Sequence, residues 1–228
     1  KINLVSNGFN NYVQNISSKI NISNFTNGID EEFLNYDFSS GNSKNKLVRV
    51  TYAGNIGSSQ GLEKIIPKVA LLTLNKYVFN VIGDGSTRRI LENTINEMNI
   101  NNVNLYNPVS RSRLLNIYAE TDILFLHLND MKAFEKVLPS KLFEYAATNK
   151  LIIAGVSGYA RKFINEYISG AYTFDPCDHK QMLKILNLFT PENNFHGERQ
   201  DFCKRFSRNA IMKSMSHDII KLIENENK

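Results

Sequence analysis

From Leu47 to Phe189, short apolar segments typical of β-strands alternate with segments whose apolar residues recur at helical spacing. The expected strands are residues 48–53, 77–82, 103–106, 122–126, 151–154 and 172–174. Such alternation predicts a parallel sheet that is covered on both faces by helices. The expected fold class is therefore α/β, with a doubly wound, Rossmann-like sheet that binds ligands at the carboxyl ends of its strands.

The loop after the first expected strand contains Gly54, Asn55, Gly57 and Gln60 and leads into a helix. Glycines let backbone N–H groups approach an anion, and the N-terminus of the following helix adds free donors and partial positive charge. An ordinary βα turn that uses glycines for tight packing would have the same composition. Together with a second such segment, the loop favours a phosphate-bearing nucleotide held between helix N-termini.

The second segment, residues 137–158, reads VLPSKLFEYAATNKLIIAGVSG. We expect Ser140 at the N-cap of a helix, with Lys141 as a mobile positive charge beside its first turn. Glu144 lies one turn along, on nearly the same face as Ser140. A carboxylate there can accept hydrogen bonds from two adjacent hydroxyls, as a ribose offers. The alternative is a solvent-facing lysine and glutamate on an amphipathic helix.

Two further loops follow expected strands and are candidates for the edge of the same crevice. Gly83 follows the strand at 77–82, where a plain turn is the alternative. Val109 follows the strand at 103–106 and offers backbone groups to a nucleotide base. His127 ends another strand, but a lone histidine is more often structural or exposed than catalytic. The sequence contains no Ser-His-Asp set, HExxH or Walker lysine motif, and we expect no metal site.

The net charge of +5 is spread over single lysines and arginines. Nucleic-acid binding would need a clustered basic stripe with interleaved aromatic residues, so we expect no nucleic-acid partner. A mildly basic enzyme that meets anionic substrates, or that works at an anionic membrane surface, fits this distribution better.

The expected compartment is the cytoplasm, including the inner face of the cell membrane. Cys177 and Cys203 have neither metal nor redox spacing and indicate reduced thiols. No apolar run reaches about 18 residues, so no transmembrane helix is expected. The chain passes from Lys1 directly into an apolar strand pattern without a visible signal peptide. We interpret it as a fragment of a longer protein.

Taken together, these segments resemble retaining glycosyltransferases of family 4, which have the GT-B architecture. The resemblance covers residues 22–189 and is most specific in YAGNIGSSQGLEKII, VIGDG, ETDILFLHL and VLPSKLFEYAATNKLIIAGVSG. It implies that residues 1–20 are the tail and linker of a missing acceptor domain. Residues 21–200 would be the donor-binding domain, and residues 201–228 a helix that packs toward the missing domain.

The resemblance also implies roles for residues of the second segment. Glu144 matches the carboxylate that holds the donor ribose. Ser140, Lys141 and Leu142 match the helix start beside the diphosphate. The sequence departs from the usual Glu-Gly-Phe-Gly run before this helix, where it has Glu135-Lys136-Val137-Leu138. The first of the family's two glutamates is therefore not assigned.

The glycine-bearing loop of the family matches Gly54 and Gly57. Many members carry an arginine and a lysine that contact the diphosphate where this chain has Asn55 and Gln60. Neutral amides can hydrogen-bond phosphate but cannot neutralise it, which makes Lys141 the obvious compensating cation and a candidate for diphosphate stabilisation.

The implied enzyme transfers a hexosyl or N-acetylhexosaminyl group from a nucleoside-diphosphate sugar to a growing bacterial surface glycan with retention, and the expected donor is a UDP-sugar. The glycan or lipid-linked acceptor would bind through the missing domain, so the fragment alone would bind donor without turnover. No cofactor is expected besides the nucleotide-sugar substrate. A nucleotide-sugar 2-epimerase of similar architecture and a non-catalytic nucleotide-binding module are the alternatives.

Overall fold

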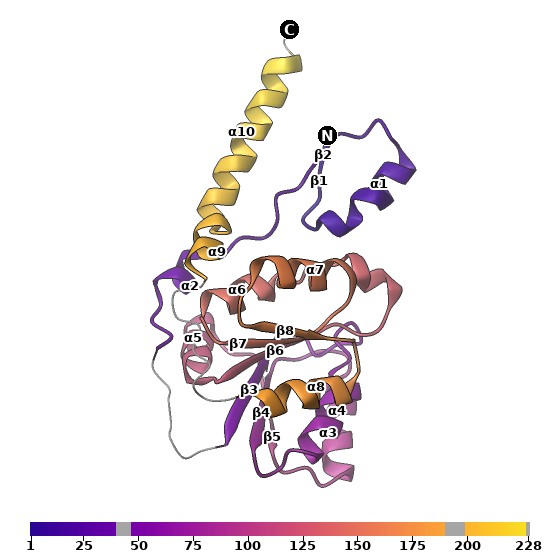
Figure 1. The fold of residues 1–228 in the computed structure, drawn as a ribbon, viewed down its shortest axis with the longest axis vertical. Coiled ribbons are helices and arrows are strands. Elements are labelled where there is room, and N and C mark those ends of the chain that lie inside the picture. The colour runs from indigo at the N-terminus through magenta and orange to yellow at the C-terminus, as the bar shows by residue number, and fades with distance from the viewer. Residues whose placement is uncertain (40–46, 190–198, 227–228) are drawn as a thin grey trace.

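The computed structural model describes residues 1–39, 47–189 and 199–226. A sheet of six parallel strands forms its centre (Figure 1). The strands are β3 (Val48–Ala53), β4 (Tyr77–Ile82), β5 (Val103–Tyr106), β6 (Ile123–His127), β7 (Leu151–Gly155) and β8 (Ala171–Phe174). Their spatial order is β5-β4-β3-β6-β7-β8. Strands are thus added first on one side of β3 and then on the other, which is the order of a doubly wound sheet.

Helices cover both faces of this sheet, as the alternating pattern predicts (Figure 1). The helices on one face are α3 (Leu62–Leu71), α4 (Arg88–Glu97) and α8 (His179–Leu188). Those on the other are α5 (Arg111–Glu120), α6 (Lys141–Ala147) and α7 (Gly158–Tyr167). The apolar side of each helix packs on the strands, so the core consists of two clusters separated by the sheet. The predicted α/β class is confirmed.

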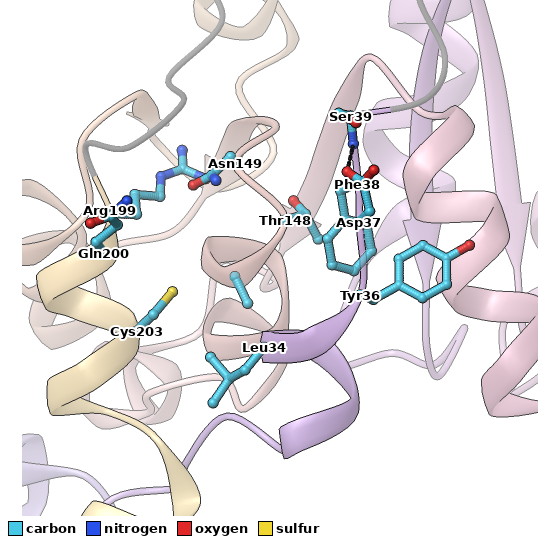
Figure 2. Close-up of a pocket in the computed structure, with 11 residues that line it drawn as sticks. Leu34, Tyr36, Asp37, Phe38, Ser39, Thr148, Asn149, Arg199, Gln200 and Cys203 are labelled. Carbon is cyan, nitrogen blue, oxygen red and sulfur yellow. Dashed lines mark hydrogen bonds between the residues drawn. The ribbon is translucent and has the colours of Figure 1, made fainter.

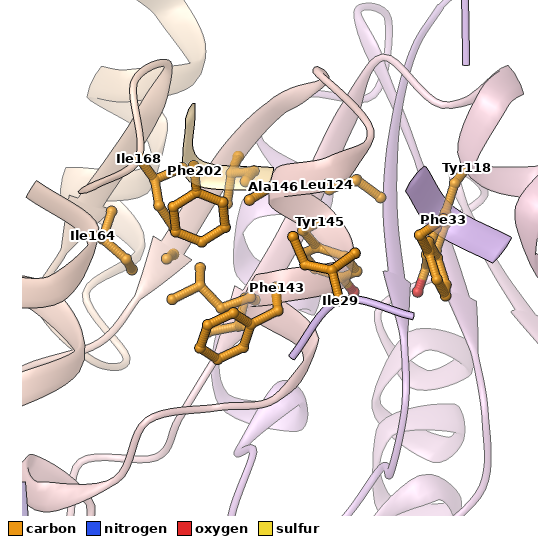
Figure 3. Close-up of a cluster of buried hydrophobic side chains, with 14 of the residues drawn as sticks. Ile29, Phe33, Tyr118, Leu124, Phe143, Tyr145, Ala146, Ile164, Ile168 and Phe202 are labelled. Carbon is orange, nitrogen blue, oxygen red and sulfur yellow. The ribbon is translucent and has the colours of Figure 1, made fainter. Parts of the chain in front are cut away.

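Two short helical segments, one before the first strand of the central sheet and one after its last, complete the core. They are α2 (Glu31–Asn35) and α9 (Gln200–Arg205). Phe33 of α2 and Phe202 of α9 are both buried in the cluster that surrounds α6 (Figure 3). Phe202 stacks on Phe143 of α6, with ring centroids 6.1 Å apart. Segments that lie more than 160 residues apart in sequence therefore close the same side of the domain.

The chain enters and leaves these layers at one place. Ile29, just before α2, forms a parallel bridge with Ser207. Its backbone accepts a hydrogen bond from the amide of Arg208 at 2.8 Å and donates one to Phe206 at 2.8 Å. Arg208 is the first residue of the long helix α10 (Arg208–Glu226), which extends away from the layers (Figure 1).

The first 24 residues form a small unit beside the layers. It contains β1 (Ile2–Asn3), a 3-10 helix η1 (Asn7–Phe9), α1 (Asn10–Ile16) and β2 (Ile22–Ser23). The two short strands pair with each other in parallel and not with the central sheet. The Ser6 hydroxyl donates to the carbonyl of Lys136, in the 3-10 helix η2 (Lys132–Lys136), at 2.5 Å. This contact fixes the unit against the segment that leads into α6.

Within the described residues, no helix combines the length and the apolar character that a membrane span requires.

Candidate functional site

A cavity of about 340 Å³ opens at the carboxyl ends of β3, β4 and β5, next to the first turn of α6. Its lining residues are Ala53, Gly54, Asn55, Ile82, Gly83, Asp84, Pro108, Val109, Leu114 and Lys141. The structure thus brings together Gly54, Asn55, Gly83, Val109 and Lys141 from four separate segments, all of which the sequence singles out. The cavity lies at the edge where doubly wound sheets bind their ligands.

Backbone hydrogen bonds hold the first two glycine-bearing loops against each other. The amide of Gly54 donates to Ile82 at 2.9 Å, and the amide of Ile56 donates to Asp84 at 2.8 Å. In addition, the Tyr52 hydroxyl donates to the carbonyl of Asn55 at 2.6 Å. The loop that carries Gly54 is therefore a fixed wall of the cavity.

The two neutral amides of this loop bond to each other. Asn55 Nδ2 donates to Gln60 Oε1 at 2.9 Å, and both side chains lie close to Gly57. Gln60 and Gly57 do not line the cavity. Helix α3 begins at Leu62 after Gly61, which has the left-handed φ of 60°. The Asn55 side chain carries two N–H donors, and the bond to Gln60 uses one of them.

An arginine outside the sequence prediction fixes the second loop. Arg88, at the start of α4, donates to the carbonyl of Gly83 and, at 2.8 Å, to that of Tyr106. It thereby ties the ends of β4 and β5 together. Its position three residues after the Gly83-Asp84-Gly85 turn is the only sequence signal for this role, and many surface arginines have similar positions.

Helix α6 carries an ion pair beside the cavity, and of its two residues Lys141 is among those that line it. Lys141 Nζ and Glu144 Oε2 lie 2.8 Å apart, one turn from each other. Lys141 lines the cavity, while Glu144 is largely covered, with 20% of its side chain exposed. The carboxylate that the sequence assigns to a ribose is thus held by the same lysine that it assigns to a diphosphate.

The beginning of α6 differs from the expected cap. Ser140 lies at the N-cap position, but its backbone is helical (φ −63°, ψ −33°) and its hydroxyl makes no capping bond. Ser140 thus occupies the predicted N-cap position, but its side chain does not cap the helix. Leu142 is fully buried, and its amide donates to Pro139 at 3.2 Å. Leu142 therefore offers the cavity no polar side chain and only an amide that is already engaged.

An ion-pair network that the sequence does not reveal lies behind Val109. Arg111, in the first turn of α5, pairs with Asp30 and, at 2.6 Å, with Glu32. Asp30 also pairs with Arg208 at the start of α10. Burial alone would raise the pKa of Asp30, but the hydrogen bonds from Arg208 and Arg111 hold it below its ordinary value. The network fixes α5 to the point where the chain enters the domain.

His127 has a structural role. It is 1% exposed, its Nε2 accepts from the amide of Cys177 at 2.9 Å, and its Nδ1 contacts the carbonyl of Gln60. With Nε2 as acceptor, Nδ1 carries the proton and the ring is neutral. Burial lowers the pKa of His127 to about 4, although the bond to Gln60 acts in the opposite direction. The ring ties the first loop to the segment after β8.

Lowering the pH is expected to weaken the fold through His127. The unfolded histidine binds a proton near pH 6.5, whereas the folded one binds it only near pH 4. The contribution of neutral His127 to the free energy of unfolding is therefore fully present above pH 6.5 and decreases as the pH falls below that value. Between pH 7.5 and pH 5 the loss is about 2 kcal/mol, by the linkage of pKa to free energy. Urea unfolding at both pH values measures it. His127→Gln should remove this part of the pH dependence, and His217→Gln, at an exposed position of α10, should keep it.

A second cavity, of about 260 Å³, lies at the other end of α6 (Figure 2). Thr148, Asn149, Arg199 and Cys203 are among its lining residues. The Arg199 guanidinium donates to the carbonyls of Ser169, Lys150 and Gly170 at 2.8, 2.9 and 3.1 Å. This arginine links backbone segments together, and the cavity contains none of the ten residues that the sequence assigns to donor binding.

A family model described as "Glycosyl transferases group 1" matches residues 35–227. Among curated proteins, WcaI of Escherichia coli K12 is 29% identical over 106 residues, which are 46% of this chain and 25% of that protein. Its name assigns it to colanic acid biosynthesis as a glycosyl transferase. The chain thus spans about a quarter of this curated relative.

Solved structures share the fold at low sequence identity. A glycosyltransferase from Rickettsia africae has a TM-score of 0.77 at 15% identity, over 99% of this chain and 64% of that one. Anabaena HepE, in complex with UDP and glucose, has a TM-score of 0.73 at 13% identity, over 95% and 62%. The lipopolysaccharide outer core galactosyltransferase WaaB has a TM-score of 0.70 at 18% identity, over 96% and 61%. The chain spans less than two thirds of each.

Proposed function

This chain belongs to the group 1 glycosyl transferases, and from that premise we propose that it is the donor-binding part of a retaining family 4 enzyme of GT-B architecture. The enzyme would transfer a hexosyl or N-acetylhexosaminyl group from a nucleoside-diphosphate sugar to a bacterial surface glycan or its lipid-linked precursor. It would do so in the cytoplasm, at the inner face of the cell membrane. The names of the curated and structural relatives, which include colanic acid and lipopolysaccharide synthesis, support this choice of acceptor.

One observation carries the proposal. Gly54, Asn55, Gly83, Val109 and Lys141 surround a single cavity at the carboxyl edge of the sheet. Backbone groups of the glycine loops suit a diphosphate, which can approach them closely. Val109 also lines this cavity, and a base bound beside it would meet backbone groups. The UDP in the Anabaena structure supports uracil as that base.

Lys141 is the side chain with a full positive charge in this cavity lining. In the proposed reaction its ammonium turns from Glu144 toward the diphosphate and stabilises the negative charge that develops on the leaving group. Glu144 is then available to accept hydrogen bonds from the ribose hydroxyls. Groups that act on the sugar and on the acceptor would come from the part of the enzyme that this chain does not span.

Exposed apolar residues near the C-terminal end of the described chain support contact with a partner domain. Helix α10 extends away from the layers and exposes Met212, Ile219, Ile220 and Ile223. We propose that residues 1–20 and 201–228 contact this acceptor domain, with residues 21–200 holding the donor.

Calorimetric titration with UDP, GDP, ADP, CMP and NAD tests the proposal. We expect saturable binding of one nucleoside diphosphate, UDP, and none of NAD. Binding of NAD alone would contradict the proposal. If none of the ligands binds to this chain or to the chain joined to its acceptor domain, a non-catalytic module is the better description.

A further inference from the structure

Strands β3 and β6 separate before they end. Their registered pairing stops at Thr51–Leu124, although β3 continues to Ala53 and β6 to His127. On its other side, β3 stays paired with β4 up to Ala53–Ile82. Successive amides of a strand point to opposite sides. Since the amide of Gly54 donates to Ile82 in β4, the amide of Ala53 points toward the space that opens beside β6.

A side chain from α6 fills this space. The Tyr145 hydroxyl accepts a hydrogen bond from the Ala53 amide at 3.3 Å. Tyr145 is 1% exposed and lies in the middle of the apolar cluster in Figure 3. It directly follows Glu144, and Ala53 directly precedes Gly54. The bond therefore joins the helix that carries Lys141 and Glu144 to the glycine loop, immediately beneath the cavity.

We propose that Tyr145 is a positioning residue for the donor: its hydroxyl sets the distance between α6 and the Gly54 loop. This inference rests on the proposed function, because it concerns the same cavity. A nucleoside diphosphate that spans the loop and Glu144 needs both at a fixed separation. Without the hydroxyl, the Ala53 amide is a buried donor without a partner, and an unpaired buried donor costs more than a hydrogen bond contributes when it is made.

The same cluster contains a matched control. Tyr118 of α5 is fully buried, and its ring meets that of Tyr145 edge-on, with centroids 5.4 Å apart. Its hydroxyl interacts with the hydroxyl of Tyr145 and, within the described part of the chain, makes no hydrogen bond to the Gly54 loop. Tyr118→Phe therefore removes the same atom from the same cluster without removing a bond to the loop.

The experiment compares wild type, Tyr145→Phe and Tyr118→Phe by amide hydrogen exchange and by UDP titration. We expect Tyr145→Phe to speed exchange at Ala53 and Gly54 about tenfold and to weaken UDP binding about five- to tenfold, as the loss of one buried hydrogen bond predicts. Tyr118→Phe should change both by less than about twofold. Urea unfolding of each variant shows whether weaker binding exceeds what lower stability explains.

Two results would overturn the inference. One is unchanged exchange at Ala53 in Tyr145→Phe, which would mean that the hydroxyl does not hold this amide. The other is an equal loss of UDP affinity in both variants, which would mean that the tyrosines act through packing alone. A failure of the proposed function is distinguishable, because wild type itself would then bind no nucleoside diphosphate, and exchange at Ala53 and Gly54 would still test the positioning contact.

Discussion

A Gly83→Ala variant is expected to lose about 4 kcal/mol of stability and to lose nucleotide binding with it. Gly83 has a φ of 144°, which side chains rarely adopt, and a Cβ there would lie 1.8 Å from the carbonyl oxygen of Gly54. Backbone strain and forced displacement each cost about 1–3 kcal/mol. The obstructing atom belongs to the backbone, so a side-chain rotation cannot move it out of the way. Because both glycines line the cavity, any relief of the clash changes its shape.

Urea unfolding and UDP titration of the variant measure the two effects. Gly170→Ala is the control, since Gly170 also has a positive φ, of 61°, but lies before β8, outside the cavity. We expect it to lose about 1–2 kcal/mol from backbone strain and to keep nucleotide affinity. Equal losses in the two variants would show that the contact between the Gly54 and Gly83 loops is not what makes Gly83 necessary.

Replacing Glu144 with alanine is expected to weaken UDP binding about 10- to 100-fold while leaving the fold nearly as stable. A hydrogen bond to a charged group contributes about 1.5–3 kcal/mol, and the proposed ribose contact relies on this carboxylate. Its bond to Lys141 is partly exposed, at 33% and 20% of the two side chains. Pairs of this kind contribute about 0–1 kcal/mol. Calorimetry gives the affinity, and urea unfolding gives the stability.

Glu92→Ala, on the exposed side of α4, changes the net charge equally and should leave binding unchanged. Glu144→Gln keeps an acceptor oxygen and should lie between wild type and Glu144→Ala. An affinity for UDP that does not change in Glu144→Ala would remove the ribose role and leave Glu144 as the partner of Lys141 alone.

The sequence predicts the sheet well because its strands are short, apolar and separated by regular helices. The bounds of β3, β4 and β5 agree with the predicted ranges 48–53, 77–82 and 103–106. It does not predict α2 and α9, since segments of five and six residues carry no measurable helical period. Their formation depends on Phe33 and Phe202 reaching the same cluster from opposite ends of the chain.

The candidate site likewise has features that the sequence predicts and contacts that it does not. Glycines after strands are visible in the sequence, and the sheet places their loops around one cavity. The contacts that hold these loops are not visible, because each joins residues far apart in the sequence. Asp30 meets Arg208, and Tyr145 meets Ala53, only once the layers are assembled. The Lys141–Glu144 pair is local, but the spacing alone does not say whether each residue faces the other or a ligand.

The bridge between Ile29 and Ser207 places the point where the chain enters the α/β layers next to the point where it leaves them. The two connections of this unit to the rest of the chain therefore lie side by side. All six strands of the central sheet lie between these two residues. The segments before Ile29 and after Ser207 therefore join the layers at one place, and the first of them makes a further contact through Ser6 and Lys136. An exchange of residues 29–207 between related chains would have to preserve both this bridge and the contact of Ser6 with Lys136.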